Sequence, residues 1–474
     1  MECSTTMKCR KTIFVLAYIV VIVLLSIDWT YSFHQYYTTP IDGDLPGAIV
    51  PADDVLPILD SPLGFNTLFN GEEYPNPNKY FAHKICHLWF NNVPLFLQHF
   101  VSPIDSLYLT CAIGKLLMHI LLIIIIIIVI TGSYRIWSFK SITLALLITT
   151  LFQSYGYQAY IGIIDIATTY SFFYALPTII LLIYLLPLLF EILHNKNIPH
   201  WVTILWLVWV PLCTLSGPLN PGIALTICFI WFAISIIKKQ KLTFNQKVLL
   251  SALTIFSLYS LFLGTNNSIN GEHIKPIIQR YADLPKGLFY ILTGKLAWPI
   301  LITSLIINTI LVKRTNATLY KQLKERWFII LTFSTLYLLL LPLGGYRDYR
   351  PYIVRYDTFI PITITMIYMY TYSTYHLIKC YNTKQRCLYL PFPILIMLIF
   401  SNADNNKYTN NQCERNAIEQ IATSNNKVVM INTDCLVAEW KQSTDPLDSK
   451  LACKMFERLN IISNEKLYFH SMDK

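Results

Sequence analysis

The chain has 474 residues, of which 54% are hydrophobic and only 14% charged, and its formal net charge is +10. A soluble globular chain carries about a quarter of charged residues, so this composition excludes an ordinary soluble protein and indicates a membrane protein. The basic residues lie mainly beside apolar runs, and no zinc-finger spacing or RNA-binding motif accompanies them. We therefore expect no nucleic-acid partner.

Eleven apolar segments predict membrane-spanning helices. They lie at about residues 12–31, 109–132, 141–156, 168–193, 201–217, 222–237, 247–264, 297–312, 327–343, 358–378 and 387–403. The first segment is too long for the apolar core of a typical signal peptide, and no small-residue cleavage site follows it. We therefore expect it to be retained, in an α-helical polytopic membrane protein of about eleven transmembrane helices.

Basic residues predict the orientation of these helices, because cytoplasmic connections are enriched in Lys and Arg. With a cytoplasmic N-terminus, every cytoplasmic connection is short and basic, as in the lysine-rich run at 238–241. The last apolar segment contains Pro391 and Pro393, and if it does not cross the membrane the chain end is cytoplasmic instead of external. The external side then holds a long first loop at about 32–108, loops at about 265–296 and 344–357, and a C-terminal tail.

We expect the tail, residues 404–474, to form a small α/β domain that follows the transmembrane domain of residues 1–403. The sequence predicts a helix at 413–423, a strand at 427–432, a second helix that begins at Asp445-Pro446 and runs to about Leu459, and a strand at 467–469. About seventy residues make a marginal core alone, and the tail carries no cofactor motif. We expect a structural or docking appendage, external to the membrane.

Four cysteines are expected on the external side, where an oxidising compartment permits disulfides. Four cysteines allow three complete pairings, and the sequence does not choose among them. No two cysteines have the C-x-x-C spacing, so we expect neither a metal nor a redox site at these residues. The four are Cys86, Cys413, Cys435 and Cys453.

The first external loop carries five aspartates within about twenty residues, and two of them flank one glycine. Asp42-Gly43-Asp44 lies between Pro40 and Pro46, so two carboxylates share a short, stiffened turn. Neighbouring carboxylates repel, which raises one pKa towards the range useful for proton transfer, and such a pair can instead bind a divalent cation. The alternative is an ordinary solvated turn. We take Asp42 and Asp44 as candidate catalytic residues and expect no other cofactor.

Basic residues are also concentrated in two external loops, against the usual distribution of charge. The loop that reads GGYRDYRPYIVRYDTF interleaves arginines with tyrosines, and the preceding external loop adds further bases. Arginine binds phosphate bidentately and keeps its charge, so these loops predict a phosphate site at the lipid boundary. Ion pairs with Asp348 and Asp357 are the alternative. The candidate substrate-binding residues are Arg280, Lys286, Tyr346, Arg347, Arg350 and Arg355.

The sequence thus predicts a carboxylate and a phosphate-binding cluster on the same external face of the membrane. A reaction that transfers a group from a lipid phosphate to a hydroxyl requires both. In this layout the chain resembles integral-membrane glycosyltransferases of the C superfamily, which use polyprenyl-phosphate sugars. The resemblance implies a catalytic carboxylate at Asp42 or Asp44 and, more loosely, arginines that hold the lipid phosphate. The family often carries an adjacent acidic pair, whereas Gly43 separates these two and the adjacent pair Asp53-Asp54 lies further along.

The resemblance also implies partners and a location. We expect a lipid-linked sugar donor, a glycan, lipid or protein acceptor, membrane lipids as surroundings, and the bacterial inner membrane. Three alternatives stay open: an envelope polysaccharide polymerase or ligase, a non-enzymatic flippase or transporter of lipid-linked sugars, and a structural membrane subunit. Few ionisable residues lie inside the spans, which disfavours transport.

Overall fold

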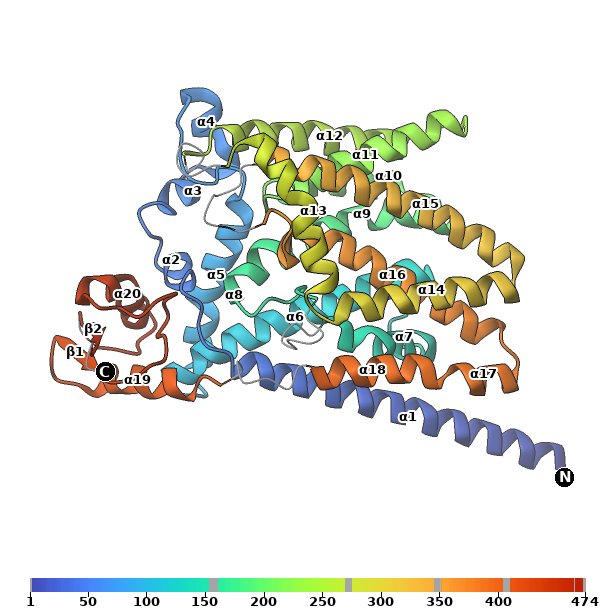
Figure 1. Cartoon of the computed structure of the whole chain (residues 1–474), viewed down its shortest axis with the longest axis horizontal. Helices are drawn as coiled ribbons and strands as arrows, with labels where there is room; N and C mark the ends of the chain where they lie inside the picture. Colours follow the sequence, from blue (N-terminus) through green and yellow to red (C-terminus); the bar gives the residue numbers. More distant parts are fainter. Residues whose placement is uncertain are drawn as a thin grey trace.

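The computed structural model describes residues 2–152, 161–268, 275–344, 350, 352–403, 410–463 and 465–471. Figure 1 shows a bundle of long helices that lie side by side. Short helices and the C-terminal unit gather at one end of the bundle, and the N-terminus lies at the other end. The chain is therefore predominantly helical, with an irregular end that holds most of its loops.

Within the described ranges, eight helices are long and apolar enough to cross a membrane. They are α1 (Glu2–Tyr37), α6 (Pro103–Thr131), the continuous run of α8 (Thr168–Tyr170), a π-helical turn (Ser171–Ala175) and α9 (Leu176–His194), α11 (Asn220–Ile237), α12 (Phe244–Thr265), α14 (Ala297–Thr315), α15 (Ala317–Leu340), and the pair α17 (Thr383–Tyr389) and α18 (Pro391–Ala403).

Three further helices occupy the other predicted segments. Two are shorter and apolar, α7 (Phe139–Thr149) and α10 (His200–Thr214), and the third is α16 (Tyr356–Cys380). Each of the eleven predicted segments thus contains a helix, although the third extends beyond residue 152 and outside the described residues. The helical membrane-protein class is confirmed, while eleven crossings remain a prediction.

The predicted external loops are more helical than expected. In the first loop, α1 continues to Tyr37 and α6 begins at Pro103, and between them lie α2 (Leu45–Ile49), α3 (Leu56–Asp60), α4 (Phe65–Asn70) and α5 (Tyr80–Leu97). The loop at 265–296 contains α13 (Ile277–Thr293). Both α5 and α13 are amphipathic, with one apolar and one polar face, so their sequences lack the continuous apolar run that revealed the other helices.

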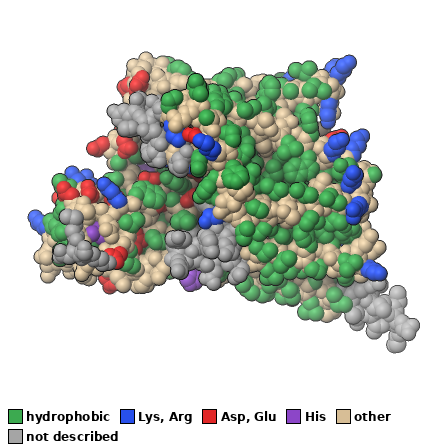
Figure 2. Space-filling view, viewed as in Figure 1, with side chains coloured by type: hydrophobic (Ala, Val, Ile, Leu, Met, Phe, Trp, Pro, Cys, Tyr) green, Lys and Arg blue, Asp and Glu red, His purple; other side chains and the backbone are tan. Residues whose placement is uncertain are grey.

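Charge and apolar surface are arranged as a membrane requires. On the face shown in Figure 2, hydrophobic side chains form a broad band over the long helices. Lys and Arg side chains gather along the right-hand edge, where the helices end, and Asp and Glu lie mostly at the opposite end with the loops. The basic end is the one that holds the N-terminus.

A buried polar network ties the C-terminal half of α1 to α6 and α7. Asp28 accepts a hydrogen bond of 2.7 Å from the Thr149 hydroxyl, and Trp29 donates to the same hydroxyl at 3.1 Å. His119 contacts the Thr149 carbonyl at 2.9 Å and the Tyr36 hydroxyl at 3.3 Å. Most of the apolar surface of α1 faces away from the bundle, so few apolar contacts fix its position. These buried hydrogen bonds hold α1 in place against α6 and α7.

The C-terminal unit has the predicted order of elements. It contains α19 (Gln412–Thr423), β1 (Val428–Ile431), a short 3₁₀ turn (Pro446–Ser449), α20 (Lys450–Arg458) and β2 (Leu467–His470), and the two strands pair in parallel. Asp445 caps the 3₁₀ turn through a 2.9 Å hydrogen bond from Leu447 N–H, as its sequence predicts. A disulfide joins Cys413 to Cys435, while Cys86 and Cys453 are buried free thiols.

Candidate functional site

The two aspartates of the Asp42-Gly43-Asp44 turn have different surroundings. Asp42 is buried, and both of its carboxylate oxygens accept hydrogen bonds at the start of α8. Thr168 N–H donates at 2.7 Å, Thr169 N–H at 3.2 Å, and the Thr169 hydroxyl at 2.5 Å. A carboxylate at a helix N-terminus satisfies free N–H groups and is favoured by the helix dipole. Asp42 therefore anchors the turn to the long helix that begins at Thr168.

Burial and hydrogen bonding act on Asp42 in opposite directions. Burial raises the pKa of Asp42, whereas its bonds to Thr169 and the charge of Lys115 lower it, with burial the largest effect. Lys115 is itself buried and donates a 2.5 Å hydrogen bond to the Ile166 carbonyl. The oxygens of Asp42 are thus already occupied by protein donors, which leaves little room for an acceptor hydroxyl.

Asp44 lines an open cavity of about 420 Å³ at the loop end of the bundle. Its carboxylate accepts a 2.9 Å hydrogen bond from the indole N–H of Trp440, which belongs to the C-terminal unit. The volume lies within the range of small-molecule sites. The lining joins the first loop, the fourth predicted span, a later loop and the C-terminal unit, and it consists of Asp44, Lys79, Tyr170, Phe173, Tyr174, Pro218, Arg350 and Trp440.

The π-helical turn Ser171–Ala175 forms one wall of this cavity. It carries Phe173 and Tyr174, and Tyr170 precedes it directly. Such a turn widens one helical turn by a residue and occurs frequently at functional sites. The anchored start of α8 and this wide turn together present two tyrosines and a phenylalanine to the cavity.

Arg350 and Arg355 both approach the Tyr174 hydroxyl at the cavity wall, but only Arg350 is part of the lining. Arg355 lies 3.4 Å from that hydroxyl and forms a 2.5 Å ion pair with Asp357. The predicted alternative of a local ion pair therefore holds for Arg355. Arg350 and Lys79, from distant parts of the sequence, supply the positive charge of the cavity.

The remaining predicted substrate-binding residues do not join this lining in the described part of the chain. Arg280 donates to the carbonyls of Lys275 at 2.6 Å, Pro342 at 3.0 Å and Gly344 at 2.9 Å, and so holds α13 against the end of α15. Lys286 is exposed and lies 3.8 Å from Asp283. Tyr346 and Arg347 lie outside the described residues.

The other acids and histidines of the first loop do not line the cavity either. Asp53 and Asp54, the adjacent acidic pair, are exposed before α3. His83 packs against the cavity residue Phe173 in a tilted arrangement, with ring centres 4.6 Å apart. Burial and the charge of Lys79 lower the pKa of His83 to about 3, so this imidazole is neutral at pH 7.

A divalent cation held jointly by the two aspartates is disfavoured by this geometry, because Asp42 is occupied by Thr168 and Thr169. Across the described residues, no group of three or more His, Cys, Asp or Glu side chains is placed to hold a metal ion. Asp44 alone remains available as a carboxylate that faces the cavity.

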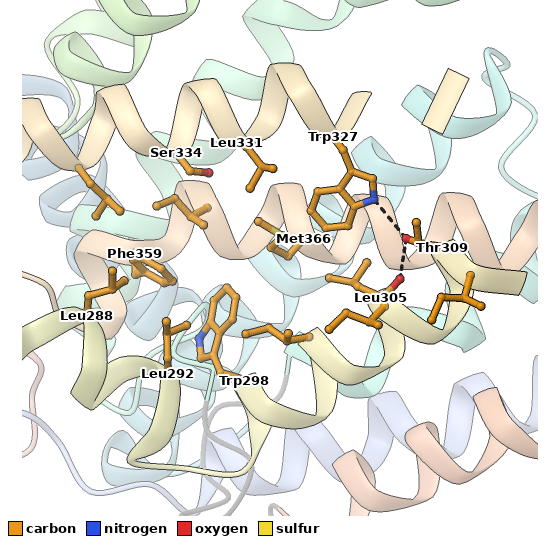
Figure 3. A pocket seen from close by; sticks show the side chains of 15 residues that line it. Leu288, Leu292, Trp298, Leu305, Thr309, Trp327, Leu331, Ser334, Phe359 and Met366 are labelled. Carbon is orange, nitrogen blue, oxygen red and sulfur yellow. Dashed lines mark hydrogen bonds between the residues drawn. The ribbon is translucent and has the colours of Figure 1, made fainter. Parts of the chain in front are cut away.

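A second cavity, a groove of about 520 Å³ open on one side, lies between α13, α14, α15 and α16. Figure 3 shows its lining, which is almost entirely apolar, with Trp298 next to Phe359 and Trp327 bonded to Thr309. The Trp298 and Phe359 rings are 5.0 Å apart, and Trp327 N–H donates to the Thr309 hydroxyl at 3.3 Å. Exposed Ile306 continues the groove to the outer, apolar surface of the bundle. In a bilayer, such a groove is open to hydrocarbon chains.

Two residues that are close in the sequence, Arg350 and Phe359, line different cavities. Arg350 lines the cavity, and Phe359, one helical turn after Arg355, lines the groove. The segment packs tightly on α13, since a Cβ added at Gly287 would lie 3.0 Å from Tyr352 Cβ and 3.2 Å from Val354 Cβ. One short stretch of chain therefore borders both a charged and an apolar site.

Sequence reasoning missed Lys79, Tyr170, Tyr174 and Trp440 among the cavity residues. Lys79 is a further base on the predicted external side, the same signal that drew attention to the arginines. Tyr170 and Tyr174 are four residues apart at the start of a helix, a spacing that places both on one face. No sequence pattern identifies Trp440 as a cavity residue, because its position depends on how the C-terminal unit docks.

The C-terminal unit docks through Glu414, which is buried. Its two carboxylate oxygens accept hydrogen bonds from Ile41 N–H at 2.9 Å, from the Tyr108 hydroxyl at 2.8 Å and from Ala438 N–H at 2.9 Å. The neighbouring Arg415 forms a 2.6 Å ion pair with Asp105. One carboxylate thus joins the first loop, α6 and the loop that leads to Trp440.

We expect this docking to weaken as pH rises. Burial raises the pKa of Glu414 to about 7, whereas its three donors and Arg415 lower it. A group with a raised pKa stabilises the folded state fully below its ordinary value near 4.5 and loses that contribution as pH rises through 7, by up to roughly 3 kcal/mol. Thermal unfolding in detergent at pH 5 and pH 8 measures the change.

Glu414→Gln should flatten this pH dependence, because glutamine does not titrate. Part of the slope should remain, since burial also raises the pKa of Glu439 to about 7. Glu419→Gln, at an exposed position of the same helix, is the control and should leave the slope intact. Equal slopes in wild type and Glu414→Gln would show that docking does not depend on this carboxylate.

Comparison with known protein families, with curated proteins and with solved structures finds no match to this chain.

Proposed function

We propose that this protein is a membrane glycosyltransferase that moves a sugar from a polyprenyl-phosphate donor to a hydroxyl acceptor. The observation that carries the proposal is the cavity in which Asp44, Lys79 and Arg350 meet although they are distant in the sequence. A carboxylate and two fixed cations in one pocket suit a reaction that removes a proton and releases a phosphate. The apolar groove, which Phe359 lines nine residues after Arg350, suits the isoprenoid chain of the donor.

Asp44 is the proposed general base, and Asp42 a positioning residue. The Asp44 carboxylate takes the proton of the acceptor hydroxyl while the oxygen of that hydroxyl forms a bond to the anomeric carbon of the sugar. The bond from that carbon to the phosphate oxygen breaks, and the lipid phosphate leaves with the electron pair. Arg350 and Lys79 then stabilise the negative charge that builds on the phosphate.

The layout of charge supports the proposed topology, in which eleven helices cross a bacterial inner membrane. The basic end of the bundle would lie in the cytoplasm with the N-terminus, and the cavity and C-terminus would lie outside. The Cys413–Cys435 disulfide is compatible with an oxidising external compartment. Donor and acceptor would then meet at the outer surface of the membrane.

The deciding experiment measures sugar transfer in membranes that contain the protein. Labelled polyprenyl-phosphate sugars of several types are supplied with an envelope extract as the source of acceptor. Label that leaves the lipid fraction only when the protein is present supports the proposal. Movement of intact lipid-linked sugar across sealed vesicles without transfer would instead support the flippase, and growth of a long lipid-linked glycan would support the polymerase.

Arg350→Ala should raise the KM for the donor by about 10- to 100-fold, because a hydrogen bond to a charged group contributes about 1.5–3 kcal/mol. The turnover number should also fall, because Arg350 stabilises the charge that develops on the leaving phosphate. Steady-state transfer at varied donor concentration measures both. Arg280→Ala is the matched control: it removes an arginine of α13 that is bonded to backbone carbonyls, and it should reduce thermal stability with little change in KM. Equal KM shifts in both variants would argue against a phosphate site at Arg350.

A further inference from the structure

The C-terminal unit presses directly on the Asp42-Gly43-Asp44 turn. A Cβ added at Gly43 would lie 2.5 Å from the backbone nitrogen of Trp440 and 2.8 Å from the carbonyl carbon of Glu439. Real Cβ atoms essentially never approach other atoms so closely, and backbone atoms cannot turn aside as a flexible side chain can. A glycine separates the two aspartates because the backbone of another unit occupies the space of its side chain.

Several bonds hold the approaching loop in this position. Ala438 N–H donates to buried Glu414, which also binds Ile41 in the first loop. The Cys413–Cys435 disulfide fastens the start of the loop to α19. The loop is therefore fixed to the C-terminal unit and to the acidic turn at the same time.

Trp440, within this loop, reaches the cavity. Its indole N–H binds Asp44 at 2.9 Å, and its ring centre lies 6.2 Å from that of Tyr170. About half of the Trp440 surface, 53%, remains exposed although both neighbours touch it. A large aromatic face thus stays open beside the proposed base, in a cavity that Lys79 and Arg350 also line.

We propose that the C-terminal unit completes the substrate site and that Trp440 binds the pyranose that is transferred. This inference rests on the proposed function and names the residue that recognises the sugar. One face of a pyranose presents C–H bonds of partial positive charge, which favour the negative face of an indole ring. Its hydroxyls require polar partners, and polar side chains such as Lys79 line the same cavity. The C-terminal unit is accordingly a part of the site and more than an appendage.

The test separates binding of the sugar from binding of the lipid phosphate. Trp440→Ala should raise the KM for the polyprenyl-phosphate sugar by about 10-fold, whereas Trp440→Phe, which keeps an aromatic face, should raise it less. Inhibition by polyprenyl phosphate without a sugar should stay unchanged in both variants. An unchanged KM in Trp440→Ala, or an equal loss of inhibition by the sugar-free lipid, would overturn the proposal.

Gly43 provides a second and independent variant. Gly43→Ala should displace the loop and reproduce the higher KM while the indole is still present. Gly47→Ala is the matched control, because a Cβ there would meet Leu451 at an ordinary 3.5 Å and should leave KM unchanged. Equal KM values in the two glycine variants would contradict a role for the docked loop.

A direct binding measurement distinguishes failure of this inference from failure of the proposed function. Methyl pyranosides are added to the detergent-solubilised protein, and saturable quenching of tryptophan fluorescence is followed in wild type and Trp440→Phe. Quenching that the variant lacks would support a sugar site at Trp440 even if no transfer from a lipid phosphate is found. Equal quenching in both proteins, or none in either, would overturn the inference even if transfer is established.

Discussion

Asp44→Asn should lower the turnover number of sugar transfer by about 100- to 10,000-fold, the usual contribution of a general base. Asparagine has nearly the shape of aspartate but cannot take a proton from the acceptor. Its amide oxygen can still accept the hydrogen bond that Trp440 donates to Asp44 at 2.9 Å. The C-terminal unit should therefore stay docked, and the loss should be one of chemistry.

Steady-state transfer and thermal unfolding together test this expectation. The KM for the donor should change little, because Arg350 and the apolar groove are untouched. Asp53→Asn is the control, since it removes an exposed carboxylate of the same loop. A full turnover number in Asp44→Asn would remove Asp44 from the role of base.

The sequence predicted the helices well because the membrane imposes one simple requirement on them, a long apolar run. It failed at α5 and α13, whose sequences alternate between an apolar and a polar face. Such helices bury only one side, and their apolar residues are interrupted by polar ones, so a search for continuous apolar runs reads them as loops. Helix α13 lines the apolar groove, and Lys79, the residue directly before α5, lines the polar cavity.

The candidate site was predicted in outline, and its chemistry depends on contacts that sequence does not reveal. Asp42 and Asp44 are equivalent in the sequence, one on each side of Gly43. Their difference arises from Thr168, 126 residues from Asp42, and from Trp440, 396 residues from Asp44. Local spacing could suggest that one carboxylate acts as a base, whereas only the packing of distant segments distinguishes an anchored carboxylate from one that faces a cavity.

Asp42→Ala should cause a loss of stability, by about 3 kcal/mol or more, and little folded protein in the membrane. The change leaves the N–H groups of Thr168 and Thr169 without their acceptor and removes the negative charge that faces buried Lys115. Buried polar groups that lose a partner cost about 1–3 kcal/mol each, and breaking a buried charge interaction costs about 3–5 kcal/mol. The yield after detergent extraction and the unfolding temperature measure the loss.

The comparison of Asp42→Ala with Asp44→Asn assigns the two carboxylates their roles. A variant of Asp42 that unfolds, beside a variant of Asp44 that is folded and inactive, is the pattern that the contacts predict. If Asp42→Ala were instead stable and inactive while Asp44→Asn stayed active, Asp42 would be the base and its bonds to Thr169 would have to open during the reaction. The Asp42 variant therefore tests two points at once. Loss of the folded protein identifies Asp42 as the anchor of α8, whereas a folded and inactive protein identifies it as the base.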